Sequence, residues 1–386
     1  MPTLSVAPAS ASDYQLLAEK RLPRALFDYI DGGAGREITL KSNTQDFDTL
    51  ALNQNVMRDV SALDTELDLF GTHMTMPLAL SPVGMGGMMR KRGEVYAARA
   101  AEKSGIPFTL STVSICSMEE VAESCSTPFW FQLYMLKDRA HVQELLERAK
   151  AVGCRTLVFT VDLAVVGARY RDTRNGMGQD VNLYGRLRSG LFEYMTHPGW
   201  AINVGLMGTP HVFGNLTQYL PRASTPADFK TWLDEQIDPS VTWADIEWLR
   251  SQWDGDLLIK GVLSPDDARS AVDAGADAVI VSNHGGRQLD GVRSTIRVLP
   301  KIADAISDRS MILIDGGVRS GQDIVKALAL GATAVMMGRP WIWALAAKGQ
   351  AGLENFLDTI HSELKTTMAL TGAVSVDQIA SNMLAD

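Results

Sequence analysis

Residues 311–339 read MILIDGGVRSGQDIVKALALGATAVMMGR, and this stretch decides the fold. Its two short apolar runs, 311–316 and 334–339, lie on either side of a segment with helical spacing. Ser320 followed by Asp323 is typical of a helix N-terminus. Strand, helix and strand in this order predict two parallel strands joined by a crossover helix.

The same alternation extends toward the N-terminus. Apolar runs occur earlier in the chain at 76–82, 108–111, 129–134, 156–162, 257–261 and 278–283. Helix-start signals separate some of them, namely Ser117 with Glu120 and Ser264 with Pro265 and Asp267. Eight strands alternating with helices predict an α/β fold, a closed (β/α)8 TIM barrel, over an open doubly wound sheet.

The 386 residues are expected to form one domain. Residues 13–75 form an N-terminal helical segment, and 76–162 and 257–365 supply the strands and helices of the barrel. Residues 163–256 are too many for one crossover helix. We therefore expect a long insertion after the fourth strand, lying over the active-site face. It begins as a loop near 174–178 and ends in the fourth barrel helix, around 243–249.

Composition excludes several classes of protein. A net charge of −9 and a pI near 5.3 provide no basic stripe for nucleic acid. The three cysteines, Cys116, Cys125 and Cys154, form no Cys-x-x-Cys pair, so neither a disulfide framework nor a metal site is expected. Charged residues at positions 13, 19, 20, 21 and 24 interrupt the apolar centre that a signal peptide needs. The expected location is cytoplasmic.

Residues 194–221 contain no Asp, Glu, Lys or Arg, although apolar side chains are frequent there. Pro198, Pro210 and several glycines rule out a continuous helix, and no apolar run approaches the roughly 20 residues of a membrane span. Two interpretations stay open. The segment rests in a membrane interface, or it packs on the barrel or on a neighbouring subunit.

Polar residues appear where the apolar runs end: Tyr134, Asp162, Lys260, Asn283, Asp315 and Arg339. The carboxyl ends of barrel strands carry the active site, so this cluster is interpreted as functional. His284 lies in SNHGGRQLDG, residues 282–291, with Arg287 three positions later. A base beside a fixed cation suits removal of a proton from an anionic substrate.

Glycine-rich turns follow the last two predicted strands, IDGGVR at 314–319 and LGATAVMMGR at 330–339. Backbone amides and arginines at this place form the usual phosphate site of a barrel. These features alone allow a flavin nucleotide, a phosphorylated sugar or a nucleotide substrate. No G-x-G-x-x-G follows the first strand, which argues against a dinucleotide-binding Rossmann domain.

SNHGGRQLDG resembles a motif of the FMN-dependent L-2-hydroxy acid oxidase and dehydrogenase family, as do Leu22-Pro23 before Phe27-Asp28-Tyr29, FQLY at 131–134 and DGGVR at 315–319. The resemblance runs from about Asp13 to the C-terminus. Residues 105–114 and 167–172 look closest to bacterial respiratory, quinone-linked L-lactate dehydrogenases.

The resemblance implies oxidation of L-lactate to pyruvate, with His284 as the base, Asp162 stabilising its imidazolium, and Tyr134 contacting the substrate hydroxyl. Tyr29, Arg287 and Arg169 would hold the carboxylate. Two routes stay open: hydride transfer while His284 takes the hydroxyl proton, or a carbanion after His284 removes the α-proton.

The implied cofactor is FMN. The phosphate would be held by Gly317, Arg319, Gly338 and Arg339. The rest of the flavin would contact Pro82, Val83, Gly84, Ser111, Gln132, Thr160, Lys260, Ser282 and Asp315.

Gly84 occupies a position where family oxidases commonly have alanine, which favours a dehydrogenase. Residues 194–221 lie where membrane-associated members carry a lipid-contacting loop. We therefore expect a quinone acceptor and peripheral contact with the inner face of the cell membrane. Val113 replaces a tryptophan of glycolate oxidases, so the pocket admits a methyl group or more. A homo-tetramer is usual for the family.

Several alternatives stay open. One is an oxidase that uses O2, and another is a mandelate-type dehydrogenase. Outside this family, the same glycine turns fit another phosphate-binding barrel or a non-catalytic flavin-binding module.

Overall fold

The computed structural model describes residues 7–176, 193–219 and 235–385. Two parts of the predicted insertion, 177–192 and 220–234, lie outside the described residues. So do the last two residues of the predicted loop at 174–178, and positions 220 and 221 of the uncharged stretch.

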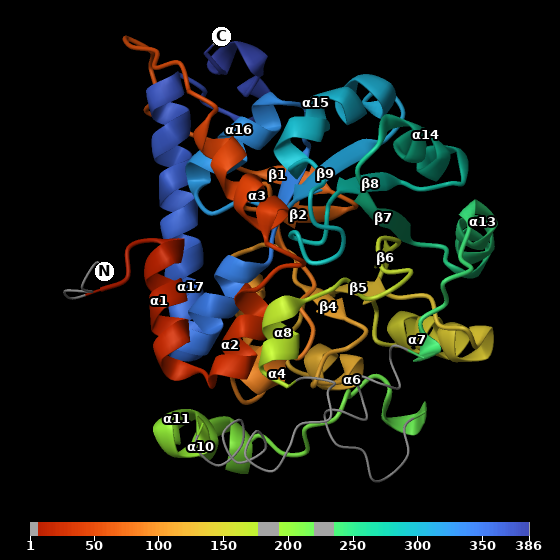
Figure 1. The fold of residues 1–386 in the computed structure, drawn as a ribbon. Coiled ribbons are helices and arrows are strands. Elements are labelled where there is room, and N and C mark those ends of the chain that lie inside the picture. Colours follow the sequence, from red (N-terminus) through yellow and green to blue (C-terminus); the bar gives the residue numbers. More distant parts are fainter. Residues whose placement is uncertain (1–6, 177–192, 220–234, 386) are drawn as a thin grey trace.

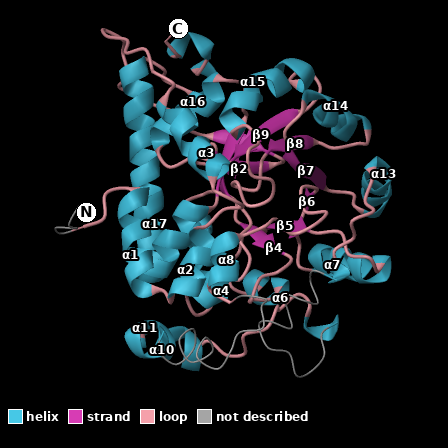
Figure 2. Ribbon diagram, viewed as in Figure 1, coloured by secondary structure: helices cyan, strands magenta, loops and turns pink. Residues whose placement is uncertain are grey.

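Eight parallel strands form the centre of the molecule (Figure 2). They are β3 (Leu78–Leu80), β4 (Thr109–Ser111), β5 (Trp130–Leu133), β6 (Thr156–Thr160), β7 (Asp256–Val262), β8 (Ala278–Val281), β9 (Met311–Asp315) and β10 (Ala334–Met337). From β4 to β10 each strand pairs with the next, β10 pairs with β3, and an isolated bridge between Leu80 of β3 and Phe108, just before β4, closes the ring. The predicted (β/α)8 barrel is confirmed, and each strand falls at its predicted apolar run.

A helix follows each strand and covers the outside of the barrel (Figure 1). These helices are α5 (Gly93–Lys103), α6 (Met118–Ala122), α7 (Arg139–Ala151), α13 (Trp243–Gln252), α14 (Pro265–Asp273), α15 (Thr295–Ile306), α16 (Gly321–Ala329) and α17 (Arg339–Thr371). The predicted caps are present, because Ser117, Ser264 and Ser320 each accept a hydrogen bond from the backbone three residues later. The predicted fourth barrel helix is α13.

The N-terminal segment contains α1 (Ala11–Arg21), α2 (Arg24–Asp31) and α3 (Ile38–Asp48), with α1 packed along α17. It also contains an antiparallel hairpin, β1 (Leu67–Leu69) and β2 (Thr72–Met74), which the sequence did not predict. Leu69 and Met74 join the core cluster inside the barrel together with Trp130 at the start of β5. The hairpin therefore closes the end of the barrel opposite the carboxyl ends of its strands.

Before α13, the described part of the insertion forms only short elements, as its prolines and glycines predict. They are α8 (Tyr170–Arg174), α10 (Glu193–Thr196), α11 (Pro198–Trp200), a π-helical turn over Ala201–Leu206 and a 3-10 turn over Thr217–Tyr219. In Figure 1, α10 and α11 lie below α2 and α4 (Gly86–Met89). The indole of Trp200 donates to the carbonyl of Met88 at 2.8 Å. Within the described ranges, no helix is long and apolar enough to cross a membrane.

Candidate active site

A cavity opens at the carboxyl ends of the barrel strands. The predicted site residues that line it are Tyr29, Pro82, Val83, Gly84, Tyr134, Thr160, Arg169, Lys260, His284, Arg287, Asp315, Gly317, Arg319, Gly338 and Arg339. Four predicted residues contact this group or lie buried behind it: Ser111, Gln132, Asp162 and Ser282. Residues of the N-terminal segment, the insertion and all eight barrel strands or their loops thus meet at one place.

His284 is fixed in a strained, defined position. Its Nδ1 lies 2.7 Å from Oδ1 of Asp162, and its backbone N–H donates to Oγ of Ser282 at 3.1 Å. The φ angle of His284 is 57°, in the left-handed region that non-glycine residues rarely adopt. Burial lowers the pKa of His284 below its usual 6.5 and outweighs the opposing effect of Asp162. The imidazole is therefore neutral near pH 7 and able to accept a proton.

Two arginines and a tyrosine lie beside this base. Arg287 donates from Nη1 to the backbone carbonyls of Tyr29 and Gly32 at 2.6 and 2.8 Å, and its guanidinium lies 5.0 Å from the centre of the Tyr29 ring. Burial and the nearby charge of Arg169 lower the pKa of Arg287 to about 9. The two positive charges repel one another, so the arrangement suits a carboxylate held by both guanidinium groups.

Tyr134 is buried at the end of β5 and also faces the cavity. Burial raises the pKa of its phenol, and the negative charge of Asp162 raises it further. The hydroxyl therefore stays protonated and can donate a hydrogen bond to a substrate oxygen.

Lys260 lies at the end of β7 in a buried polar cluster. Its Nζ donates to Oγ of Ser282 at 2.8 Å and lies 3.2 Å from Oδ2 of Asp315. Ser81 also donates to Asp315, at 2.9 Å. Burial alone would raise the pKa of Asp315, but Lys260 and Ser81 hold it below its usual range. The cluster places one fixed cation and one fixed carboxylate inside the cavity.

An anion site lies beyond this cluster, as the glycine turns predict. Helix α17 begins at Arg339, with Gly338 as its N-cap residue, and helix N-termini attract anions. Burial and mutual repulsion lower the pKa of Arg339 to about 10, and burial lowers that of Arg319 to about 10. A side chain built on Gly338 would meet no protein atom closer than 3.7 Å, so its backbone is open to a ligand.

Comparison with known proteins agrees with this geometry. Residues 18–386 match the model of the FMN-dependent dehydrogenase family. The chain belongs to this family. An L-lactate dehydrogenase of Alcaligenes faecalis is 53% identical over 97% of this chain and 98% of its own length. One of Acinetobacter baumannii is 52% identical, over 97% of both chains.

Solved structures of other proteins share the fold. A monotopic membrane protein, (S)-mandelate dehydrogenase, has a TM-score of 0.92 and 35% identity, covering 98% of this chain and 100% of its own. A mandelate oxidase has a TM-score of 0.81 and 36% identity, over 98% of both chains. The family, the barrel and the FMN cofactor predicted from the sequence are thus confirmed.

Buried polar residues at the carboxyl ends of β5 and β6 fit the flavin of an FMN-dependent dehydrogenase. The amide Nε2 of Gln132 and the hydroxyl of Thr160 are buried and have no hydrogen-bond partner in the described part of the chain. Buried polar groups are rarely left unpaired, so both point to a polar ligand. Ser111 donates to the other amide atom of Gln132 at 3.1 Å, which fixes its orientation. A flat heterocycle with several acceptors and donors satisfies these groups.

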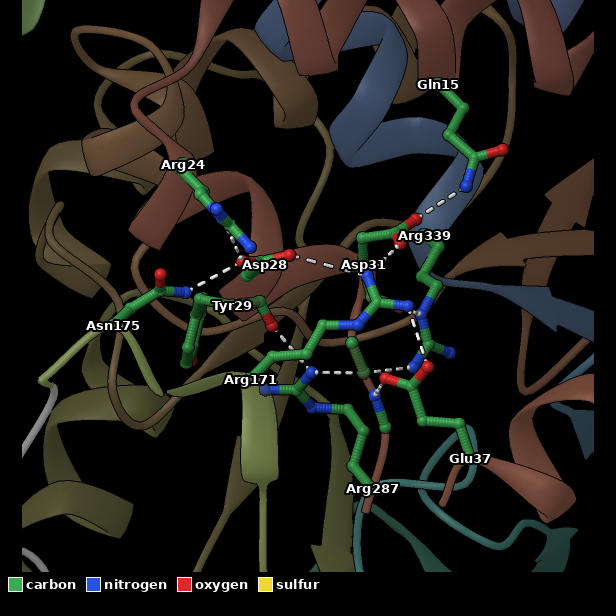
Figure 3. A network of polar contacts seen from close by, with 12 residues as sticks. Gln15, Arg24, Asp28, Tyr29, Asp31, Glu37, Arg171, Asn175, Arg287 and Arg339 are labelled. Carbon is green, nitrogen blue, oxygen red and sulfur yellow. Dashed lines mark hydrogen bonds and ion pairs between the residues drawn. The ribbon is translucent and has the colours of Figure 1, made fainter. Parts of the chain in front are cut away.

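Sequence reasoning missed several residues that support the site. Asn43 is one of them. Its amide forms two hydrogen bonds of 2.8 Å with the amide of Asn283, a residue that the sequence had marked as functional, and these bonds fix the loop before His284. Gln288 donates to the carbonyls of Asp162 and Val165 at 2.9 Å each. Gln288 lies inside the motif already singled out, whereas nothing in the local sequence marks Asn43. Arg171, drawn in Figure 3, is a third such residue.

Proposed function

We propose that this FMN-dependent dehydrogenase oxidises L-lactate to pyruvate. The observation that carries the proposal is the neutral His284, backed by Asp162 and placed beside Arg287, Arg169 and Tyr29. A base next to a carboxylate site is what a 2-hydroxy acid requires. Identity of 53% to an L-lactate dehydrogenase over 97% of the chain supports this substrate.

The roles of the residues follow from their positions. Arg287, Arg169 and the Tyr29 hydroxyl hold the carboxylate, and Tyr134 donates to the oxygen that becomes the keto oxygen. Because Nδ1 of His284 is bonded to Asp162, Nε2 takes the substrate proton. Asp162 then stabilises the imidazolium. Bound FMN supplies the acceptor for the electron pair.

The cofactor roles are part of the same proposal. Gly317, Arg319, Gly338 and Arg339 would hold the phosphate. Lys260 would provide positive charge beside the flavin ring, and Asp315 would contact the ribityl chain. The residues that would contact the ring are Pro82, Val83, Gly84, Ser111, Gln132, Thr160 and Ser282. The unpartnered atoms of Gln132 and Thr160 support this arrangement.

The wall around the substrate side chain is apolar. Val113, Leu163, Val166 and Phe213 line the cavity, so a methyl group is buried there without an unpaired polar neighbour. The mandelate-type enzymes that share the fold make (S)-mandelate the second substrate to test.

The proposed electron acceptor is a quinone, reached by peripheral contact with the inner face of the cell membrane. Two features support it: Gly84 at the cavity, and the exposed apolar side chains of Met195, Ile202, Leu206 and Met207 on the insertion. The resemblance to a monotopic membrane protein is compatible with this contact. The homo-tetramer stays a prediction from the family, which the native mass in solution tests.

A visible spectrum under argon tests the proposal. L-Lactate should bleach the flavin bands, which should stay bleached for minutes in air and recover with a soluble quinone analogue. Rapid recovery in air would make the protein an oxidase. Bleaching by (S)-mandelate but not by L-lactate would assign the other substrate. An apoprotein that FMN cannot reconstitute would refute the cofactor assignment.

A further inference from the structure

The backbone turn of residues 29–32, at the C-terminal end of α2, holds two of the site's arginines at once (Figure 3). The carbonyls of Tyr29 and Gly32 accept from Nη1 of Arg287 at 2.6 and 2.8 Å. The carbonyls of Asp31 and Gly32 accept from Nε and Nη2 of Arg339 at 3.0 and 2.8 Å. Gly32 thus contacts both guanidinium groups. The placement of both arginines therefore depends on the backbone of residues 29–32.

Arg171 fixes this turn from the outside. Its Nη1 donates to Oδ2 of Asp31 at 2.8 Å, and its Nη2 donates to Oε2 of Glu37 at 2.7 Å. The other oxygen of Glu37 accepts from the backbone N–H of Gly33 at 3.0 Å. A single guanidinium therefore joins Asp31 in this turn to Glu37 at the start of α3, and its planar fork suits two carboxylates at once.

The charges in this network depend on one another. Partial burial alone would lower the pKa of Arg171, but hydrogen bonds to Glu37 and Asp31 raise it overall. Partial burial alone would raise the pKa of Glu37, but Arg171 and the N–H of Gly33 hold it below its usual range. Asp28, 3.5 Å from Arg171, adds a third carboxylate. Without Arg171, these acids would repel one another beside the arginines of the site.

We propose that Arg171 is a positioning residue for both the substrate carboxylate and the flavin phosphate. It does not line the cavity, and it acts through the turn whose carbonyls hold Arg287 and Arg339. Arg171 follows Arg169 by two positions. The same segment of the insertion therefore supplies Arg169, which binds the substrate carboxylate, and Arg171, which fixes Arg287 and Arg339. The inference rests on the roles proposed above for Arg287 and Arg339.

The test compares Arg171→Met with Arg250→Met as the matched control. The side chains of Arg171 and Arg250 are 30% and 27% exposed, and each forms an ion pair of 2.8 Å with an aspartate. Arg250 lies on α13 and contacts the start of the β7 region, at the opposite end of the barrel. We expect both variants to lose stability with their ion pairs, so a purely structural role for Arg171 would leave ligand binding alike in the two.

For Arg171→Met, we expect the dissociation constant of FMN and the KM for L-lactate each to rise about tenfold, with a smaller change in kcat. This size is typical of coupling between neighbouring residues. Arg171→Lys should recover part of both effects, because an ammonium can keep one of the two ion pairs but lacks the fork. Glu37→Gln should shift both constants in the same direction, and it provides a second variant if Arg171→Met does not fold.

The two measurements separate this inference from the proposed function. FMN titration of the apoprotein needs no substrate, so it reports on Arg339 even if L-lactate fails to reduce the flavin. If the unmodified protein oxidises L-lactate while Arg171→Met binds FMN and L-lactate as Arg250→Met does, the inference is wrong. If FMN affinity falls in Arg171→Met but L-lactate reduces neither protein, the substrate assignment alone is wrong.

Discussion

Nδ1 of His284 and Oδ1 of Asp162 lie 2.7 Å apart, although 122 residues separate them in the sequence. Asp162 follows β6 and His284 follows β8, so the barrel brings the two side chains together across the end of β7. The contact orients the imidazole, and Nε2 forms no hydrogen bond with any described residue. This pair is the first place to test the proposed chemistry.

His284→Gln should abolish reduction of the flavin by L-lactate and leave FMN bound. General-base catalysis contributes about 10²–10⁴-fold, so we expect a rate loss of at least this size. Stopped-flow absorbance measures the rate, and the flavin spectrum measures occupancy. Unchanged reduction would eliminate His284 as the base.

Asp162→Asn should change the pH profile of reduction. His284 acts as a base only when neutral, so activity falls as the pH drops through its pKa, which lies below 6.5 in the unmodified protein. Removing the carboxylate removes an effect that raises this pKa, so the acid limb should move to lower pH. The rate at the plateau should also fall, because the imidazolium loses its partner. An acid limb that moves to higher pH would contradict this account.

Gly84→Ala should crowd the substrate cavity. A side chain on Gly84 would lie 2.7 Å from Cγ2 of Val113 and 3.3 Å from the hydroxyl of Tyr29. Overpacking costs about 1–3 kcal/mol, which corresponds to a fall of about 5- to 150-fold in kcat/KM for L-lactate. Adding Val113→Ala should restore most of the loss. If the double variant is no better than the single one, contact with Val113 is not the cause.

Gly317→Ala should destabilise the protein and weaken FMN binding. Gly317 has a φ of 108°, and an added side chain would lie 2.0 Å from the carbonyl of Asn43. Gly291→Ala is the control, since Gly291 has a φ of 87° but open space around it. The left-handed conformation alone costs about 1–2 kcal/mol. Urea unfolding should show a larger loss for Gly317→Ala, and only that variant should need more FMN for saturation.

The barrel could be predicted because its strands are buried on both faces and therefore appear as continuous apolar runs. The β1–β2 hairpin could not, because its three-residue strands carry no periodic signal. Most of the predicted residues that line the cavity lie at strand ends or in glycine turns, where a lone polar side chain is conspicuous. This is why His284 and Lys260 were found from the sequence. Tyr29 on α2 and Arg169 in the insertion were predicted only through the family resemblance.

Supporting residues were missed for a different reason. Asn43 acts on Asn283 across 240 residues, and Arg171 acts on Glu37 across 134. Nothing in the local sequence marks Asn43, and Arg171 lies in the run 167–172, which the resemblance singled out without giving Arg171 a role. Only the closed barrel brings each residue to its partner. Asn283 itself was predicted from its place at a strand end, but that place does not distinguish a ligand contact from a contact with α3.

Replacing Ile202 and Leu206 together with serine should weaken binding to lipid vesicles. These side chains are 56% and 73% exposed on the insertion. Each substitution would remove about 1.5–3 kcal/mol of the free energy gained by burying an apolar side chain in a membrane interface. We expect the partition coefficient between vesicles and water to fall at least about a hundredfold.

The control pair is Val56→Ser with Leu370→Ser. Val56 is 72% exposed in the loop before β1, and Leu370 is 54% exposed near the end of α17. Reduction of the flavin by L-lactate should be unchanged in both pairs. If both pairs cosediment with vesicles as the unmodified protein does, this face of the insertion does not contact the membrane.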